Sequence, residues 1–234
     1  MVSDMARSGA LRPAFAVSAD TVLLAAPDAE LLTFVRRRLS APYPGRWELP
    51  GCSMQPGEDL LTAARRGLRE VLGSDRSLAH LEQIAAFGSP RRDPRGPVLS
   101  VAFLGLARPE AVEASDGGGG RWVPVAELLA RPRGVAFDHA AIVREGIARL
   151  GAAMQSSTLG AGLCQRDFTV GELRRVYETV WGAELDARNF HRKLTGTPGL
   201  LAATRKVTTR HGGRPARLYR TGSVTRLDPP ITRP

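Results

Sequence analysis

The chain has 234 residues, of which 43% are hydrophobic and 24% are charged, a balance that is typical of a folded protein rather than a disordered one. No apolar run approaches the roughly 20 residues of a membrane-spanning helix, and the first residues lack a signal-peptide core. We therefore expect a cytoplasmic protein with no membrane partner. Cys52 and Cys164 lie in different segments with no partner spacing, so neither a disulfide framework nor a zinc site is expected.

The formal charge of +10 is concentrated towards the C-terminus. Residues 165–234 hold fourteen Lys or Arg and six Asp or Glu, so they carry +8, and the other 164 residues carry only +2. Between Arg188 and Arg220 there are nine basic residues and no acidic one. A genome biased towards arginine would not by itself remove every carboxylate from 33 consecutive positions. This segment therefore predicts a polyanionic partner.

Apolar periodicity predicts a mixed, antiparallel-rich sheet with helices in the first part of the chain. Strands are expected at residues 14–26, 30–37, 80–88, 96–107 and 122–124. A helix is expected from Leu60 to Leu72, because Asp59 can cap its start and Gly73 can end it. The residues of its inward stripe would be Leu61, Ala64, Leu68 and Leu72. A second helix is expected at residues 138–150.

The segment from Trp47 to Gly73, WELPGCSMQPGEDLLTAARRGLREVLG, carries a specific but broken motif. It resembles the signature of the Nudix pyrophosphohydrolases, G-x5-E-x7-R-E-U-x-E-E-x-G-U with U apolar, which builds a loop and a helix for a metal-bound diphosphate. The matching residues are Glu58, Arg66, Leu68, Glu70 and Gly73, and the departures are Cys52 for a glycine and Gly67 and Val71 for two magnesium-binding glutamates. Positions 67, 70 and 71 share one helical face, so only one carboxylate is left there. We therefore expect no bound metal and no catalytic residue.

The C-terminal part reads as helix, turn, helix and basic hairpin, which is the order of a winged helix-turn-helix. Thr169 and Glu172 form a capping box, followed by the inward positions Leu173, Val176, Tyr177, Val180 and Trp181. Asp186 can cap the next helix, in which the inward positions are Ala187, Phe190 and Leu194. Strand-like segments follow at residues 200–209 and 216–220. We predict domains at 1–155 and 156–222, and a loose, proline-rich tail at 223–234.

Basic and aromatic side chains near the broken motif could rim a pocket for a diphosphate, because arginine binds phosphate in a bidentate manner. The candidate effector-binding residues are Arg36, Arg46, Trp47, Glu58, Glu70, Arg92 and Arg95. A plainer role is open to some of them, since Trp47 can pack in the core and Glu58 can hold Arg66 as a scaffold salt bridge. His139, at a predicted helix start, is expected to cap or pack rather than to act as a base.

The second helix of a helix-turn-helix enters the major groove, where Arg and Lys suit phosphates or guanine and Asn suits adenine. The candidate DNA-binding residues on this helix and on the hairpin are Arg188, Asn189, His191, Arg192, Lys193, Arg210, Arg214 and Arg217. For any one of them a solvated surface position is the competing interpretation. The DNA-binding hypothesis therefore depends on these residues taken together and on the order of helix, turn, helix and hairpin.

With both halves in place, the whole chain resembles the NrtR family, Nudix-related transcriptional regulators of NAD metabolism. The matching segments span most of residues 14–220 and are GRWELPG, the broken Nudix motif, SPRRDPRGPVLSVAFL, VAFDHAAIV, FTVGELRRVYETVWGAELDARNFHRKL and HGGRPARLYR. The resemblance implies an α/β fold, a Nudix α/β/α sandwich with a mixed sheet followed by a C-terminal winged helix-turn-helix domain. It also implies a homodimeric repressor on a palindromic double-stranded DNA operator near genes of NAD biosynthesis or salvage. ADP-ribose would bind the Nudix domain as an effector that releases the DNA, and no cofactor is expected.

Two other functions stay open from the sequence. An active magnesium-dependent ADP-ribose pyrophosphatase with a basic appendage is opposed by the missing carboxylate pair. An RNA-associated Nudix protein is opposed by the lack of aromatic residues among the basic ones, because readers of single-stranded RNA stack bases on aromatic rings.

Overall fold

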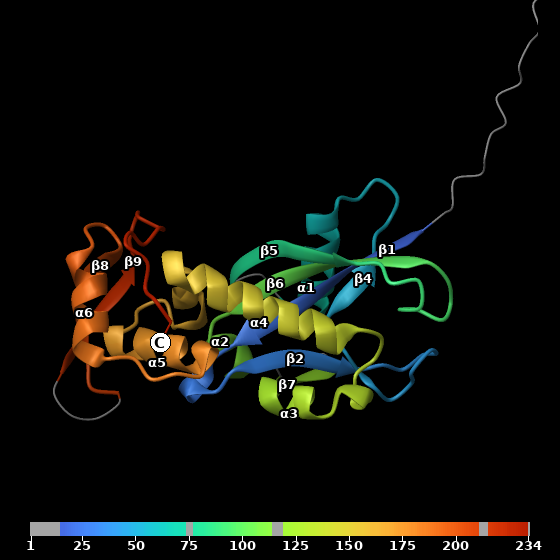
Figure 1. The fold of residues 1–234 in the computed structure, drawn as a ribbon, viewed down its shortest axis with the longest axis horizontal. Helices are drawn as coiled ribbons and strands as arrows, with labels where there is room; N and C mark the ends of the chain where they lie inside the picture. The colour runs from blue at the N-terminus through green and yellow to red at the C-terminus, as the bar shows by residue number, and fades with distance from the viewer. Residues whose placement is uncertain (1–14, 74–76, 114–118, 211–214, 234) are drawn as a thin grey trace, which may run out of the picture.

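The computed structural model describes residues 15–73, 77–113, 119–210 and 215–233. A sheet-centred part and a smaller C-terminal part of helices and a hairpin lie end to end (Figure 1). Within the described residues, no helix is both long enough and apolar enough to cross a lipid bilayer.

The central sheet is mixed, as predicted. Its strands are β1 (Ala16–Ala25), β2 (Leu32–Arg37), β3 (Trp47–Glu48), β4 (Gly51–Ser53), β5 (Leu78–Phe87), β6 (Val98–Ala107) and β7 (Gly120–Pro124). The main path runs β3-β2-β1-β6-β5, with β4 paired to β1 and β7 paired to β2. Only the β1–β6 pair is parallel among these described strands, and β1 and β2 form the expected hairpin.

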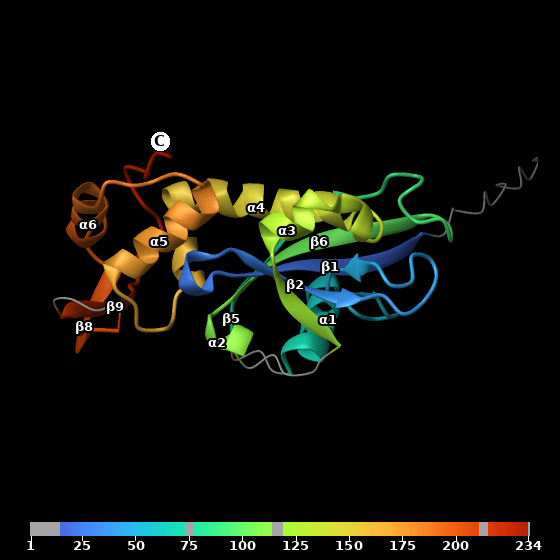
Figure 2. The ribbon, with the colours of Figure 1, turned by 90° about the horizontal axis from the view of Figure 1, so that it is seen from below.

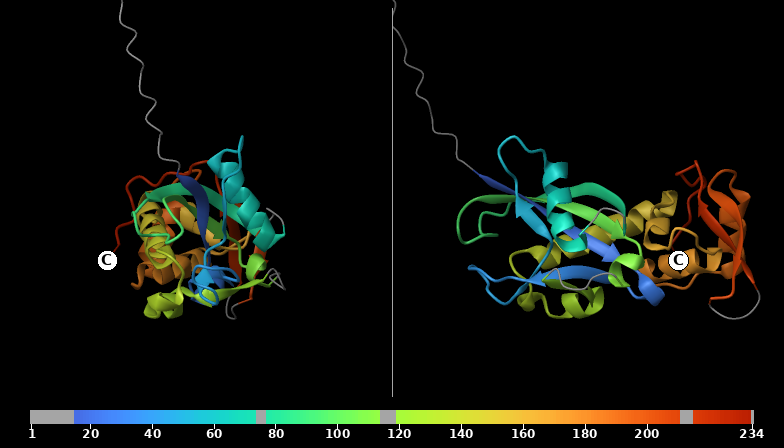
Figure 3. Two further views of the ribbon diagram at one scale, coloured as in Figure 1. Left: turned by 90° about the vertical axis from the view of Figure 1, so that its right-hand side faces the viewer. Right: turned by 180° about the vertical axis from the view of Figure 1, so that it is seen from behind.

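Helices cover both faces of this sheet, which gives the expected α/β/α sandwich. Helix α1 (Leu60–Leu72) lies on one side, and α3 (Val125–Ala130) and α4 (His139–Ser156) lie on the other (Figures 2 and 3). Because both faces are covered, β1 is buried without alternation from Ala19 to Ala25. Val22 and Leu24 pack into the core beneath α4, whereas Leu23 and Ala25 pack into a second core on the α1 side.

Helix α1 has the predicted caps, but one residue of its predicted stripe is wrong. The Asp59 carboxylate accepts a hydrogen bond from the Thr62 backbone N–H at 2.7 Å, and Gly73 ends the helix in the left-handed conformation at φ 65°. Leu61 is exposed rather than inward. The buried residues are Ala63, Ala64, Gly67, Leu68 and Val71. The face on which the Nudix motif carries two metal ligands therefore packs against the sheet here.

The C-terminal part is the predicted winged helix-turn-helix. Its elements are α5 (Val170–Trp181), α6 (Ala187–Gly196) and the antiparallel hairpin of β8 (Leu201–Thr208) and β9 (Ala216–Thr221). Both halves of the Thr169–Glu172 capping box are formed. Phe190 and Leu194 are buried as predicted. Ala187 is exposed, because it lies in the first turn of α6, before that helix reaches the core.

The prediction of a loose C-terminal tail is wrong for the described residues 223–233. The Thr225 carbonyl accepts a hydrogen bond from the Thr158 backbone N–H at 3.1 Å, and the Leu227 N–H donates to Ser156 O at 2.8 Å. Leu227 is only 2% exposed, and the Ile231 N–H donates to Gln155 O at 2.8 Å. Prolines prevent a helix in this segment, but its backbone bonds and one apolar anchor hold it against the end of α4.

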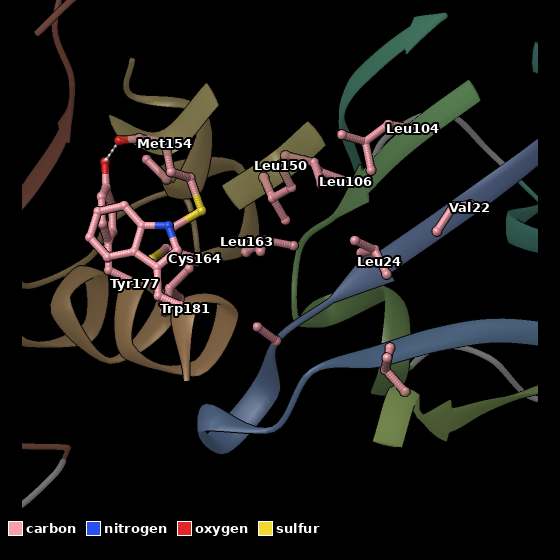
Figure 4. Close-up of a cluster of buried hydrophobic side chains, with 14 of the residues drawn as sticks. Val22, Leu24, Leu104, Leu106, Leu150, Met154, Leu163, Cys164, Tyr177 and Trp181 are labelled. Atoms are coloured by element: carbon pink, nitrogen blue, oxygen red, sulfur yellow. Dashed lines mark hydrogen bonds between the residues drawn. The ribbon is translucent and has the colours of Figure 1, made fainter. Parts of the chain in front are cut away.

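The two parts share one hydrophobic core at the C-terminal end of α4 (Figure 4). The Tyr177 hydroxyl lies 2.9 Å from Met154 O and 3.1 Å from Ser157 O, and the Trp181 indole N–H donates to Gly151 O at 2.9 Å. Gly151 and Met154 lie in the last two turns of α4 and Ser157 is its C-cap, and the Met154 carbonyl has no partner within the helix. Helix α5 therefore completes α4, and burial at this junction raises the pKa of the Tyr177 phenol.

Replacing Tyr177 by Phe should lower the free energy of unfolding by about 1–2 kcal/mol, because buried carbonyls at the end of α4 lose a hydrogen-bond donor. Urea unfolding followed by circular dichroism measures the change. The matched control is Tyr219→Phe, whose hydroxyl has no hydrogen bond within the described residues and should change stability by less than about 0.5 kcal/mol. Equal effects of the two substitutions would contradict this role of Tyr177.

Candidate functional site

A cavity of about 590 Å³ opens where the middle of the sheet meets the 88–97 loop and the start of α4. This volume lies within the roughly 300–1,000 Å³ of small-molecule pockets. Its charged and aromatic lining residues are Asp20, Arg36, Arg38, Glu48, Arg92, Asp93, Arg95, Phe137 and His139. We call this cavity the sheet pocket.

Arg36 and Arg38 enter the sheet pocket from the end of β2 and share one carboxylate. Arg36 Nε lies 3.0 Å from Glu48 Oε1, and Arg38 Nη1 lies 2.7 Å from Glu48 Oε2. Residues two apart on a strand point to the same face, so the Arg36 prediction should have included Arg38. Sequence reasoning missed Arg38 although the alternation within the Arg36–Arg38 run was a usable signal.

Arg92 and Arg95 are held in the sheet pocket by carboxylates on either side of it. The buried Arg92 guanidinium makes two hydrogen bonds to Asp138, at 3.0 and 2.7 Å. Arg95 Nη2 lies 2.6 Å from Asp93 Oδ2, and this hydrogen-bonded guanidinium lowers the pKa of the Asp93 carboxyl. Asp93 is buried whereas the Arg95 side chain is 56% exposed, so Arg95 can reach a ligand more readily than Arg92.

Phe137 supplies an aromatic wall that sequence reasoning missed. The Arg38 and Arg95 guanidinium carbons lie 4.9 and 5.6 Å from the centre of its ring, and the Tyr43 ring meets it edge-on at 5.2 Å. Its backbone has φ 51°, which turns the chain sharply just before α4 begins. No local pattern indicates this placement, because it depends on the approach of β2 and the 88–97 loop.

The floor of the sheet pocket is a buried polar network around Asp20 and His139. The Asp20 carboxylate accepts hydrogen bonds from Ser18 Oγ at 2.8 Å and Ser100 Oγ at 2.5 Å. His139 Nδ1 accepts one from the Leu49 N–H at 3.0 Å, and burial lowers the pKa of His139. This is the packing role expected for His139, and it ties the start of α4 to the Nudix motif.

Glu58 and Arg66 form the scaffold pair that the sequence indicated. Arg66 donates from Nε and Nη2 to the two carboxylate oxygens of Glu58, at 2.9 and 2.8 Å. Hydrogen bonding to Arg66 lowers the pKa of Glu58 to about 2. Glu58 therefore braces the loop before α1 and does not line the sheet pocket.

The remaining residues do not fit a divalent metal ion. Glu70 is the one carboxylate left among the three Nudix positions on α1, and its ion-pair partner is Arg36, with Arg36 Nη1 and Glu70 Oε2 3.6 Å apart. No group of three or more His, Cys, Asp or Glu in the described part of the chain is arranged to hold a metal.

Besides Glu58, two of the predicted effector-binding residues lie away from the sheet pocket. The Trp47 ring is covered by the guanidinium groups of Arg37 at 3.6 Å and Arg121 at 4.7 Å. Arg46 lies over the Tyr43 ring at 4.6 Å. Neither Arg46 nor Trp47 lines the cavity, so the structure brings together only Arg36, Arg92 and Arg95 of the predicted set, with Glu70 at its edge.

The winged helix presents a separate cationic surface. A groove of about 330 Å³ lies between α5, α6 and the β8–β9 hairpin, which we call the wing. Its basic lining residues are Arg175, Arg210 and Arg217, and α6 contributes His191. Arg188 is exposed in the first turn of α6. Asn189, Arg192 and Lys193 line a different groove, shared with the C-terminal segment. The predicted α6 residues therefore divide between two sides of the helix.

Several basic residues of the wing form ion pairs with acidic residues of the same chain. Arg210 Nε lies 2.6 Å from Glu172 Oε1, and Arg220 and Lys206 both bind Asp167. Arg210, predicted to contact DNA, thus anchors the wing to α5. Arg217 is exposed and has no ion pair among the described residues, and Arg214 lies outside them.

The chain is similar to known regulators over almost its whole length. It is 28% identical over 214 residues to the ADPR responsive transcriptional repressor NtrR of Acinetobacter baylyi, which covers 89% of this chain and 82% of that protein. The crystal structure of Shewanella oneidensis NrtR complexed with a 27mer DNA matches with a TM-score of 0.83 at 27% identity, covering 92% of this chain and 99% of that one. The NUDIX domain of the same protein complexed with ADP ribose matches with a TM-score of 0.52 at 26% identity, covering 62% and 94%.

Two family models match successive parts of the chain. The NUDIX domain model matches residues 15–145, which is more than half of the chain, and the NrtR DNA-binding winged helix domain model matches residues 160–221. These two segments correspond to the sandwich with its sheet pocket and to the winged helix with its cationic surface. The chain therefore belongs to the NrtR family, in which a Nudix domain is joined to a DNA-binding winged helix domain.

Proposed function

We propose that this chain is a transcriptional repressor of NAD biosynthesis or salvage genes, which binds a palindromic DNA operator as a homodimer in the cytoplasm and releases it when ADP-ribose binds the sheet pocket. The observation that carries the proposal is an arginine-lined Nudix pocket without a metal-binding carboxylate set, joined through one helix, α4, to a cationic winged helix. The structures of Shewanella oneidensis NrtR with a 27mer DNA and of its NUDIX domain with ADP ribose support the proposal that this chain binds DNA and ADP-ribose.

The sheet pocket has the chemistry that ADP-ribose requires. Arg36, Arg38 and Arg95 offer guanidinium donors for a diphosphate, because each is positioned by at least one carboxylate that does not use all of its N–H groups. Phe137 offers a ring on which adenine can stack. The predicted roles of Arg46, Trp47 and Glu58 have no such support, because these side chains lie outside the cavity.

The same pocket is unsuited to hydrolysis. Cleaving a diphosphate in a Nudix site needs metal ions to activate water and to neutralise the developing charge. Here Gly67 and Val71 are buried and carry no carboxylate, and Glu70 faces a guanidinium. We therefore propose a sensor that binds its ligand without destroying it, in place of an active ADP-ribose pyrophosphatase.

Helix α4 is the proposed route from the sheet pocket to the winged helix. At the start of α4, the N-cap residue Asp138 binds Arg92, and His139 accepts a hydrogen bond from the Leu49 N–H. Its last turns bind Tyr177 and Trp181 of α5. A ligand that shifts Arg92 would tilt α4 and change the spacing of two winged helices on half-sites about one DNA turn apart. We propose the division into residues 1–155 and 156–222 on the same grounds, with α4 ending at Ser156.

A gel shift at fixed salt should show specific binding to DNA from the region upstream of the protein's own gene, and ADP-ribose should release it more effectively than NAD. Binding that persists at saturating ADP-ribose would remove the sensor, and no binding to the upstream DNA would remove the repressor. Fixed salt matters because phosphate contacts make the affinity for DNA depend steeply on ionic strength.

Arg188→Ala and Arg217→Ala should each weaken operator binding by about tenfold, and Arg217→Ala should also reduce the salt dependence by about one counterion. Arg133→Ala removes the same charge from an exposed position in the sandwich and serves as the control, with an expected change below about twofold. Fluorescence anisotropy over a salt series measures both quantities. An Arg133→Ala loss as large as the other two would indicate only a general effect of net charge.

In magnesium, the purified chain should release no more AMP from ADP-ribose than the Glu70→Gln variant does, because one carboxylate cannot build the metal site. Chromatography of the nucleotides after a long incubation measures this. Turnover in magnesium that Glu70→Gln abolishes would establish the pyrophosphatase alternative.

Phe137→Leu should weaken ADP-ribose binding by about tenfold, since loss of base stacking costs about 1–3 kcal/mol, while operator affinity in the absence of ADP-ribose stays within about twofold. Isothermal titration calorimetry and anisotropy measure the two. Phe34→Leu, in the core on the α1 side and away from the sheet pocket, is the control for a general loss of packing. If Phe137→Leu leaves ADP-ribose affinity unchanged, the ring is not part of the ligand site.

A further inference from the structure

We propose that the guanidinium group of Arg36 takes the place of the divalent cation in this Nudix domain, so that the sheet pocket binds a diphosphate ester without any metal ion. The inference rests on the proposed function, because it assigns a cation to the pocket that receives ADP-ribose. It goes beyond the loss of metal ligands, since it names the group that supplies the missing positive charge.

Arg36 reaches the Nudix motif at three points. Its Nε lies 3.0 Å from Glu48 Oε1, its Nη2 donates to the Gly51 carbonyl at 3.2 Å, and its Nη1 lies 3.6 Å from Glu70 Oε2. The group is therefore located between the start of the diphosphate loop and Glu70, the one metal-binding position of α1 that keeps a carboxylate. Glu48 is mostly buried, so it fixes the direction of the guanidinium more firmly than the half-exposed Glu70 does.

A guanidinium group can carry out the electrostatic part of the metal's role. It stays positively charged at all working pH values, and its planar donors match the oxygen atoms of a phosphate. Arginine has five N–H donors, and the two hydrogen bonds of Arg36 engage two of them, whereas its 3.6 Å contact with Glu70 is a looser ion pair. At least two donors are therefore left for a ligand. A guanidinium does not activate a bound water for attack, so the same replacement favours binding without hydrolysis.

Gly67 fits the same arrangement. A Cβ atom at this position would lie 3.3 Å from Gly51 Cα, slightly closer than ordinary contact, and 3.4 Å from the Gly51 carbonyl carbon. A glutamate at position 67 would therefore press on the residue whose carbonyl oxygen binds Arg36. The loss of a carboxylate at Gly67 and the contact between Arg36 and Gly51 are thus structurally compatible, and α1 lies close to the loop because Gly67 lacks a side chain.

The proposal reverses the expected effect of Glu70. In a metal-bound pocket Glu70 would hold the cation, so its removal would abolish diphosphate binding. In an arginine-based pocket Glu70 competes with the diphosphate for Arg36 and repels it, so its removal leaves the affinity unchanged or increases it. Because Glu70 is half exposed and outside the core, Glu70→Gln tests this difference without a folding problem.

The first experiment is isothermal titration calorimetry of ADP-ribose into the full chain, in excess EDTA and in millimolar magnesium. The two affinities should agree within about twofold, Glu70→Gln should bind equally or several-fold more tightly, and Arg36→Gln should bind about tenfold more weakly in both buffers. An increase of tenfold or more on adding magnesium, or a loss of binding in Glu70→Gln, would overturn the proposal.

Arg37→Gln is the matched control. It makes the same charge change at the next position of β2, but Arg37 points to the other face, over the Trp47 ring, and does not line the sheet pocket. Its affinity for ADP-ribose should stay within about twofold of the unmodified chain. An Arg37→Gln loss equal to that of Arg36→Gln would show that net charge, not the position of the guanidinium, governs binding.

A second measurement needs no ADP-ribose. We expect no Mn²⁺ site that depends on Glu70. Electron paramagnetic resonance titration with Mn²⁺ should therefore give the same result for the unmodified chain and for Glu70→Gln. A Mn²⁺ site lost in Glu70→Gln would overturn the proposal even if ADP-ribose proves not to be the effector. If ADP-ribose fails to bind in either buffer, the proposed effector is wrong, while the manganese titration still tests whether Glu70 holds a metal ion.

Discussion

The contacts at the two ends of α4 are the constraint on which the rest of the structure depends. At its start, the Asp138 cap binds Arg92, and His139 accepts the Leu49 N–H from the Nudix motif. At its end, the Tyr177 hydroxyl binds the Met154 carbonyl, which the helix itself leaves without a partner, and the Trp181 indole binds the Gly151 carbonyl one turn earlier. In between, Gly146 lets the helix lie against Val22 of the sheet, where a Cβ would approach to 3.1 Å. One helix therefore belongs to the ligand pocket, the sheet core and the winged helix at once.

The sheet pocket depends on how its positive charge is balanced. Glu48 binds both Arg36 and Arg38, Glu70 forms a looser ion pair with Arg36, and Asp138 and Asp93 bind Arg92 and Arg95, respectively. Each guanidinium is thus positioned by a carboxylate without being fully used by it, which prepares the pocket for an anion at little cost in side-chain entropy. This arrangement differs from a metal site, in which carboxylates gather around a removable ion.

The winged helix uses its charge in two ways. Arg210, Lys206 and Arg220 are paired with Glu172 and Asp167, and these pairs set the position of the wing against α5. The exposed cations of α6 and Arg217 lie outside these pairs and are available to a polyanion. The strongly basic stretch of sequence therefore contains both structural and potential binding residues, and only their partners distinguish them.

The sequence by itself determined the element order, the caps of α1, α5 and α6, the Glu58–Arg66 pair and the loss of the metal ligands. These features depend on residues that are close in sequence, so helical spacing, capping and strand alternation are sufficient to predict them. The tertiary structure decided which arginines share the sheet pocket, because Arg36, Arg95 and Phe137 come from separate segments that meet only when the sheet, the 88–97 loop and α4 pack together. It also decided that residues 223–233 are packed and that Arg210 is an internal anchor, since both depend on contacts with distant carbonyl and carboxylate groups that no local pattern specifies.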